Sequence, residues 1–271
     1  MEMMKESTVD KAQQDVVKPA CFGNWTDIYG YPITSKILPL VARINWITPN
    51  FVTLFSFFMF IAGCILLFYR VPYHQYISAF LLLSAYIGDQ LDGQLARSKN
   101  LSSRIGNYLD KVIDVIKIYA ITVSLSWAAY SLHQDVMYVF LGFAACFFFN
   151  LRYYIKLETV LSEACRDAAY LEKSRVRENE LLREIILLHS KLSGGGIHDR
   201  VKLFWIKNRT IFFVDEGEFV VVTSIGILIG RVDWALWVLA ISQILIVSFR
   251  LWQRGYQTHI GSKDLLDPMR K

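Results

Sequence analysis

Long apolar runs separated by short polar stretches dominate most of this chain. Six runs have roughly the length, about 20 mainly apolar residues, that crosses the hydrocarbon core of a bilayer. They cover residues 51–69, 76–95, 105–132, 136–154, 211–230 and 234–251. Within each successive pair of runs the connection is only a few residues long, so paired helices should be antiparallel. The pattern predicts an all-α integral membrane protein with six transmembrane helices.

The polar stretches around these runs complete the predicted organisation. Residues 1–26 are expected to form a disordered tail, and residues 27–48 an interfacial amphipathic helix that Pro32 and Pro39 interrupt. Residues 156–208 are rich in helix-forming residues and predict a cytoplasmic helical insert. The remaining units are transmembrane helices 1–4 with the candidate site (49–155), transmembrane helices 5–6 (209–252) and a cytoplasmic tail (253–271).

Composition supports a membrane protein. Hydrophobic residues make up 54% of the chain and charged residues 20%, against about 45–50% and about 25% in soluble domains. Most of the charge lies in residues 1–48 and 156–208. These figures exclude a disordered chain, a collagen-like chain and an ordinary soluble enzyme.

The distribution of Lys and Arg predicts the orientation. Twenty-five of the 29 basic residues fall in residues 1–48, in the stretch after the second run, in residues 152–209 and in residues 250–271, all of which the six-span pattern puts on one side. Because basic residues concentrate in cytoplasmic loops, both termini should be cytoplasmic, in the inner membrane if the source is prokaryotic. Topology and anionic lipid then account for the net charge of +5, and no nucleic-acid partner is expected.

Acidic residues recur at helical spacing where the second and third runs meet. Ionisable residues within spans are costly and are therefore candidates for function. On the second predicted helix the shared face holds Asp89, Asp92, Gly93 and Ala96; on the third it holds Gly106, Asp110 and Asp114. The short connection lets the two faces oppose one another near the cytoplasmic surface.

Four carboxylates converging in a medium of low dielectric cannot all remain ionised without cations. All-oxygen ligation favours two Mg²⁺ or Mn²⁺ ions over zinc. Gly93, Ala96 and Gly106 leave room for a ligand close to the backbone, and Arg97 offers a fork for phosphate. A two-metal site beside an arginine suits phosphoryl-type transfer.

The complete pattern resembles the signature of the CDP-alcohol phosphotransferase family: Asp89-x2-Asp92-Gly93-x2-Ala96-Arg97-x8-Gly106-x3-Asp110-x3-Asp114. Thr48-Pro49-Asn50-x2-Thr53 is similar to a stretch often found before the first span of family members. The resemblance implies cleavage of a CDP-linked donor within its diphosphate. A phosphatidyl or phosphoalcohol group then moves to a hydroxyl acceptor and CMP is released. It also implies a homodimer.

The resemblance also implies roles for the individual motif residues of this sequence, according to their positions in the motif. The resemblance implies that Asp89, Asp92 and Asp110 ligate metal, and that Asp114 completes the site and acts as general base on the acceptor hydroxyl. It also implies a group of substrate contacts, which are Gly93, Ala96 and Gly106 beside the cytidine, Arg97 on a donor phosphate, and Asn50 and Thr53 close to the nucleotide.

Other charged residues leave alternatives open. Lys117 flanks the acidic face and could bind a phosphate or pair with Asp114 or another carboxylate. Arg152 is a candidate for the acceptor pocket, and so are three acidic residues at the start of the fifth run, Asp215, Glu216 and Glu218. Exposed interfacial charge is the competing interpretation for Arg152 and the three acidic residues.

Three function hypotheses remain at this stage. The first is phospholipid synthesis from a CDP-diacylglycerol donor and a small polar acceptor of the inositol phosphate, serine or glycerol phosphate type. In the second, the lipid is the acceptor and not the donor: a CDP-linked head group of the choline or ethanolamine type goes to a lipid alcohol. The third is a non-catalytic transport or scaffold protein that retains a relic of the metal site, and the intact signature argues against it.

Overall fold

A computed structural model describes residues 25–44, 46–70, 72–101, 103–173, 176 and 214–259, and every element in these ranges is a helix. The predicted N-terminal tail, apart from its last two residues, lies outside the described residues. Most of the predicted insert and the end of the C-terminal tail lie outside them too.

Each of the six apolar runs corresponds to a helix. In chain order these are α3 (Pro49–Tyr69), α4 (His74–Ser98), α5 (Arg104–His133), α6 (Met137–Arg166), α9 (Glu216–Leu228) and α10 (Val232–His259). The sixth helix begins close to its predicted start. The fourth, α6, continues twelve residues beyond the predicted end of its run at residue 154.

Four of these helices, α3, α5, α6 and α10, are long and apolar enough to cross a membrane. The protein is therefore an integral membrane protein. The second half of α4 carries the polar motif, and α9 has 13 residues, a length of roughly 20 Å against a hydrocarbon core of about 30 Å. Residues 211–213 of the fifth run are not described, so six spans stay a prediction.

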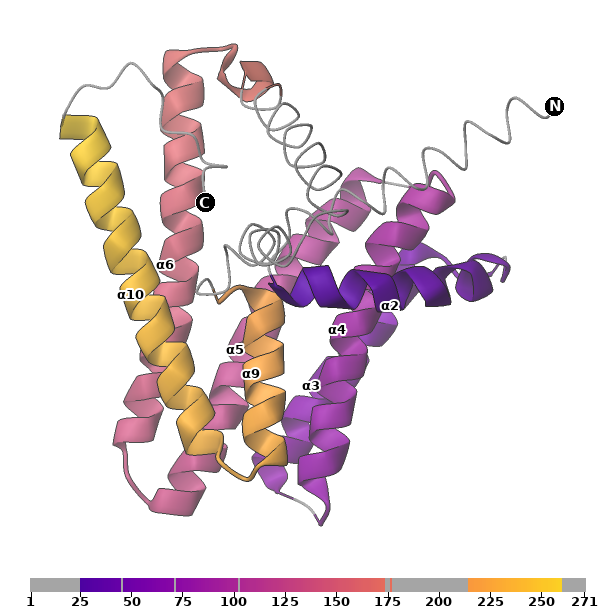
Figure 1. The fold of residues 1–271 in the computed structure, drawn as a ribbon, viewed down its shortest axis with the longest axis vertical. Coiled ribbons are helices and arrows are strands. Elements are labelled where there is room, and N and C mark those ends of the chain that lie inside the picture. Colours follow the sequence, from indigo (N-terminus) through magenta and orange to yellow (C-terminus); the bar gives the residue numbers. More distant parts are fainter. Residues whose placement is uncertain are drawn as a thin grey trace, which may run out of the picture.

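The six helices form a closed ring in the order α3, α4, α9, α10, α6, α5, with each helix packed on the next and α5 returning to α3. Figure 1 shows α6 and α10 side by side. The apolar core draws on every helix of the ring, including Phe60, Leu82, Leu125, Phe219 and Leu236. Because lipid tails are as apolar as these side chains, the helices are held together by close van der Waals packing and interhelical hydrogen bonds.

Side-chain caps fix where α3 and α5 begin. The Thr48 hydroxyl accepts a hydrogen bond from the Phe51 amide, and Pro49 occupies the first turn, where its missing N–H costs nothing. The Ser103 hydroxyl likewise accepts from the Gly106 amide at 2.9 Å. These two starts bring Asn50 and Gly106 together, as described below.

A further helix, α2 (Trp25–Ala42), runs crosswise over the ring and packs on α4 (Figure 1). Pro32 and Pro39 both lie inside it, so the expectation that they interrupt the helix is wrong. Each proline removes one backbone hydrogen bond. The buried residues Tyr31 and Thr34 hold this part of α2 against α4, and that packing compensates for the lost bonds.

Candidate active site

Three carboxylates from two helices converge at one point. Asp89 and Asp92 of α4 and Asp110 of α5 each offer an oxygen, and these oxygens lie within 4.8 Å of one another. The backbones of α4 and α5 make little direct contact in the described residues, whereas both helices pack on α3 and on α9. The neighbouring helices therefore set the gap across which the carboxylates face one another.

Hydrogen bonds fix two of these carboxylates. The Thr53 hydroxyl of α3 donates to Oδ2 of Asp92, which is only 8% exposed. The ammonium group of Lys117 on α5 pairs with Oδ1 of Asp89. Of the alternatives for Lys117, the structure thus shows pairing with a carboxylate. A cluster of oxygen donors of this kind fits Mg²⁺ or Mn²⁺ and lacks the softer nitrogen and sulfur donors that favour zinc.

Asp114 is not a member of that three-carboxylate group. Its Oδ2 accepts from Lys111 Nζ at 2.9 Å, and its Oδ1 lies 3.8 Å from Lys117 Nζ. The side chain is buried, and Oδ1 has no hydrogen-bond partner in the described part of the chain. A buried oxygen with an unused lone pair can accept a proton from a bound hydroxyl.

The two glycines of the motif have different surroundings: Gly93 faces open space, and Gly106 lies against Asn50 of α3. A Cβ built on Gly93 would meet only Arg97, at 3.5 Å, so protein packing does not demand a glycine there. A Cβ on Gly106 would lie 3.1 Å from Oδ1 of Asn50. Asn50 is therefore adjacent to the motif, where its predicted nucleotide contact requires it. Ala96 lies one turn after Asp92 on α4 and is half-buried.

Arg97 is anchored from α2. Its Nη2 donates to the hydroxyl of Tyr31 at 2.7 Å, while the residue as a whole remains exposed. Three positions earlier on α4, Gln94 donates to the Thr34 hydroxyl, which joins the same two helices. Sequence reasoning missed Tyr31, because nothing local marks a tyrosine that orients a group 66 positions later.

A cavity of about 270 Å³ adjoins the aspartates, with walls from α3, α4, α5, α6 and α9. Asp89 and Asp114 line its motif side together with Lys111 and Lys117. Asp215 and Glu216 line the opposite side. The third acidic candidate, Glu218, is buried and accepts from the Asp215 amide in a capping box, so it holds the start of α9.

Arg152 fastens α6 to the start of α9. Its Nη1 donates to the Val214 carbonyl at 3.0 Å, its Nη2 pairs with Asp215, and its guanidinium lies 4.9 Å from the centre of the Phe149 ring. Arg152 is not among the residues that line the cavity, though its partner Asp215 is. Its predicted contact with substrate stays a prediction.

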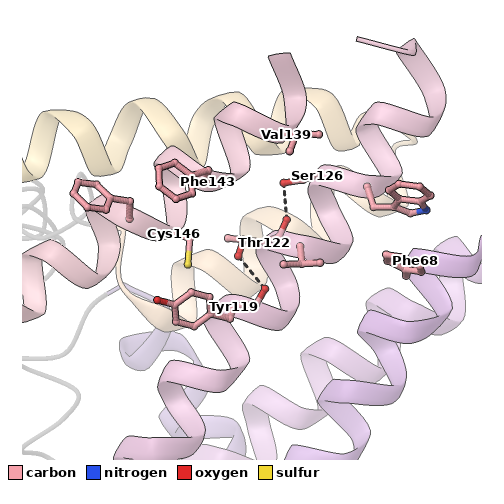
Figure 2. Close-up of a pocket in the computed structure, with 10 residues that line it drawn as sticks. Phe68, Tyr119, Thr122, Ser126, Val139, Phe143 and Cys146 are labelled. Atoms are coloured by element: carbon pink, nitrogen blue, oxygen red, sulfur yellow. Dashed lines mark hydrogen bonds between the residues drawn. The ribbon is translucent and has the colours of Figure 1, made fainter. Parts of the chain in front are cut away.

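A second hollow lies between α5 and α6 (Figure 2). It measures about 330 Å³ and is lined by apolar and hydroxyl side chains, among them Phe68, Phe143 and Cys146. The Thr122 and Ser126 hydroxyls there bond to carbonyls of their own helix. No acidic or basic side chain lines it. Charge chemistry in the described residues thus centres on the cavity beside the aspartates.

Comparisons with known proteins agree with this architecture. The model of the CDP-alcohol phosphatidyltransferase family matches residues 46–167. An uncharacterized protein of Aquifex aeolicus (strain VF5) is 28% identical over 103 residues, which are 37% of this chain and 51% of that protein. The match thus spans about half the length of this relative.

The fold is also similar to a solved structure. The crystal structure of Mycobacterium tuberculosis phosphatidylinositol phosphate synthase with CDP-DAG bound superposes with a TM-score of 0.53 and 19% identity. The alignment covers 81% of this chain and 92% of that one. The resemblance carried by the motif is therefore confirmed, since residues 46–167 match the model of the CDP-alcohol phosphatidyltransferase family.

Proposed function

We propose that this chain is a membrane-embedded CDP-alcohol phosphotransferase that moves a phosphatidyl group from CDP-diacylglycerol to a small polar alcohol and releases CMP. The observation that carries the proposal is the convergence of Asp89, Asp92 and Asp110 beside a cavity that Asp114 also lines. The family match supports the reaction class. The CDP-DAG in the similar synthase structure supports the choice of donor.

The donor atoms of the site fit two divalent ions, Mg²⁺ or Mn²⁺, held by Asp89, Asp92 and Asp110, with Asp114 as the fourth carboxylate. Bound there, such ions would neutralise the diphosphate and stabilise the negative charge of the departing CMP. The Thr53 hydroxyl donates a hydrogen bond to Oδ2 of Asp92 and so fixes the orientation of this carboxylate for metal binding.

The remaining motif residues orient the donor. Arg97 presents its guanidinium to a donor phosphate while Tyr31 fixes one of its nitrogens. Gly93 and Gly106, with Ala96, let the cytidine approach the backbone of α4 and α5. Asn50 lies against Gly106 and is close enough to the motif to bond the nucleotide.

Asp114 acts as the general base. The acceptor hydroxyl in the cavity gives its proton to Oδ1 of Asp114, the buried oxygen that lacks a partner. The acceptor oxygen then bonds to the phosphorus of the transferred group, and the bond from that phosphorus to the CMP oxygen breaks. Lys111 and Lys117 hold the Asp114 carboxylate in place.

The location of the lipid follows from the membrane setting. Acyl chains remain in the bilayer beside the helices, and the nucleotide enters from the cytoplasmic side, on which both termini are proposed to lie. A homodimer is part of the proposal through the family resemblance alone.

CMP release tests the proposal. Purified full-length protein is incubated with Mg²⁺ or Mn²⁺, radiolabelled CDP-diacylglycerol and a panel of alcohols, and both CMP and lipid products are measured. We expect CMP and a new phospholipid in equal amounts. Product only from CDP-choline or CDP-ethanolamine with diacylglycerol would instead support the reversed arrangement. The absence of CMP from every donor would support the non-catalytic alternative.

A further inference from the structure

One polar side chain interrupts the apolar inner face of α10. Gln243 is fully buried, and every other buried residue of α10 between positions 235 and 247 is apolar, for example Leu239 and Val247. A buried amide costs free energy unless its polar atoms find partners. The partner that Gln243 has chosen therefore indicates what the residue is for.

The Gln243 amide reaches the start of α9. Its Nε2 donates to the Val214 carbonyl at 2.8 Å, and Nη1 of Arg152 on α6 donates to the same oxygen at 3.0 Å. A carbonyl oxygen has two lone pairs, so these two donors saturate it. Two helices, α10 and α6, thus hold one carbonyl group at the point where α9 begins.

The neighbouring polar groups at this point are bound as well. The Asp215 amide, which shares a peptide plane with the Val214 carbonyl, donates to Oε2 of Glu218 at 3.0 Å. The Asp215 carboxylate pairs with Arg152. Because a peptide group is planar and rigid, bonds at both of its polar atoms fix the direction in which the chain enters α9.

This fixed entry determines where one wall of the cavity beside the aspartates lies. Asp215 and Glu216 come directly after the fixed peptide and line that cavity, as Asp114 does. The Tyr153 hydroxyl donates to Oε1 of Glu216 at 2.9 Å. In the proposed reaction the diphosphate of the donor lies at the three-carboxylate group, so the alcohol occupies the space between Asp114 and the start of α9.

We propose that Gln243 is a positioning residue for the acceptor alcohol: its hydrogen bond to the Val214 carbonyl holds the start of α9 where the alcohol hydroxyl meets Asp114. The inference rests on the proposed function. Gln243 does not line the cavity, so it acts through the chain at Val214 and Asp215 and not on substrate. A small displacement of a reacting group from its productive position lowers the rate strongly.

A residue that served stability alone would behave differently. Oε1 of Gln243 is buried and has no hydrogen-bond partner in the described part of the chain, which costs stability. An apolar side chain of the same length removes that cost together with the bond to Val214, and Arg152 still binds the carbonyl. Stability should therefore change little, whereas the start of α9 loses one of the two donors that fix it.

Gln243→Met tests the proposal, because Met has nearly the length and shape of Gln but no donor. Purified full-length protein is assayed for CMP release from CDP-diacylglycerol with the most active of serine, inositol, inositol phosphate and glycerol 3-phosphate. The kcat/KM for the alcohol should fall about 10- to 100-fold. The KM for CDP-diacylglycerol should stay within about twofold, and the midpoint of thermal unfolding in detergent within about 4 °C of the wild-type value.

Two further variants complete the experiment. Gln243→Leu also removes the donor and should give the same result. Ser242→Ala on the same helix is the matched control, since the Ser242 hydroxyl bonds to the Leu239 carbonyl of α10 itself, and it should leave all constants unchanged.

Three results would overturn the inference and leave the proposed function standing. They are wild-type constants for the alcohol in Gln243→Met, an equal rise in the KM values for alcohol and donor, and a failure of both Gln243 variants to fold. The absence of CMP from the wild-type protein with every acceptor would overturn the proposed function and the inference together.

Discussion

The hydroxyl of Thr53 on α3 donates a hydrogen bond to the buried carboxylate of Asp92 on α4, 39 positions later in the chain. The bond links the start of the first apolar run directly to the acidic motif. It fixes the orientation of one carboxylate in a cluster where three must converge.

Replacing Thr53 by the isosteric Val should therefore weaken metal binding. We expect the Mg²⁺ or Mn²⁺ concentration for half-maximal activity to rise about 10- to 100-fold, because the partners that orient metal ligands contribute on that scale. Thr159→Val on α6 is the matched control, since the Thr159 hydroxyl bonds only to the Ile155 carbonyl of its own helix. An unchanged metal dependence in Thr53→Val would show that Asp92 needs no such support.

The Arg97 guanidinium should contribute its fork geometry to donor binding. Arg97→Lys keeps the charge but loses the paired donors, so the KM for the CDP-linked donor should rise about tenfold or more. Tyr31→Phe separates direct from indirect effects because it removes only the anchoring hydroxyl. The KM of Tyr31→Phe should rise less than that of Arg97→Lys; the reverse order would make Tyr31 the principal contact.

Asp114→Asn should lower kcat by about 10²- to 10⁴-fold, the usual contribution of a general base. The KM for the donor should change little, since Asp114 lies outside the three-carboxylate group. Lys111→Met provides the comparison: it removes an ion pair with Asp114 and keeps the base. Substantial turnover in Asp114→Asn would refute its role.

Close packing of α5 on α6 should be sensitive to a single methyl group. A Cβ on Gly142 would lie 1.6 Å from Oγ and 2.9 Å from Cβ of Ser126, too close for rotation of the serine alone to relieve. Gly142→Ala should therefore cost about 1–3 kcal/mol of stability. In a thermal unfolding experiment in detergent, Ser126→Gly added to Gly142→Ala should recover part of the loss; additive destabilisation would contradict the contact.

Accessibility of single cysteines tests the orientation. In a variant without Cys21, Cys64, Cys146 and Cys165, cysteines placed at exposed Leu101 and Asp135 mark opposite ends of α5. A membrane-impermeant maleimide should label Leu101→Cys only from the cytoplasmic side and Asp135→Cys only from the other. The opposite result would invert the proposed topology.

The helices of the ring could be predicted because bilayer-length apolar runs leave a plain signal in the sequence. Where the chain turns from apolar to polar within one helix, hydropathy predicts the wrong boundary. Beyond residue 154, α6 turns polar but stays helical to Arg166, so hydropathy alone ended it too early. In α2, tertiary packing on α4 outweighed the local effect of Pro32 and Pro39.

The motif could be found from the sequence because helical spacing puts Asp89 and Asp92 on one face of a single helix. Asp215 and Glu216 on the other wall of the cavity could be named as candidates for the acceptor pocket, but their partners could not be found in this way. Tyr153 and Glu216 meet across 63 positions and belong to different helices. No periodicity links them, so only the packing of α6 beside α9 reveals the pair.

The ion pair of Arg152 and Asp215 joins two points of the chain that are 63 positions apart, one on α6 and one at the start of α9. After Arg152, α6 continues for 14 residues to Arg166, a length of roughly 21 Å at the rise of a helix. An extended strand of about seven residues could cover the return to Val214. The connection in this chain is instead residues 167–213. Most of this length is surplus to joining the two helices, so a shortened linker should leave the ring intact.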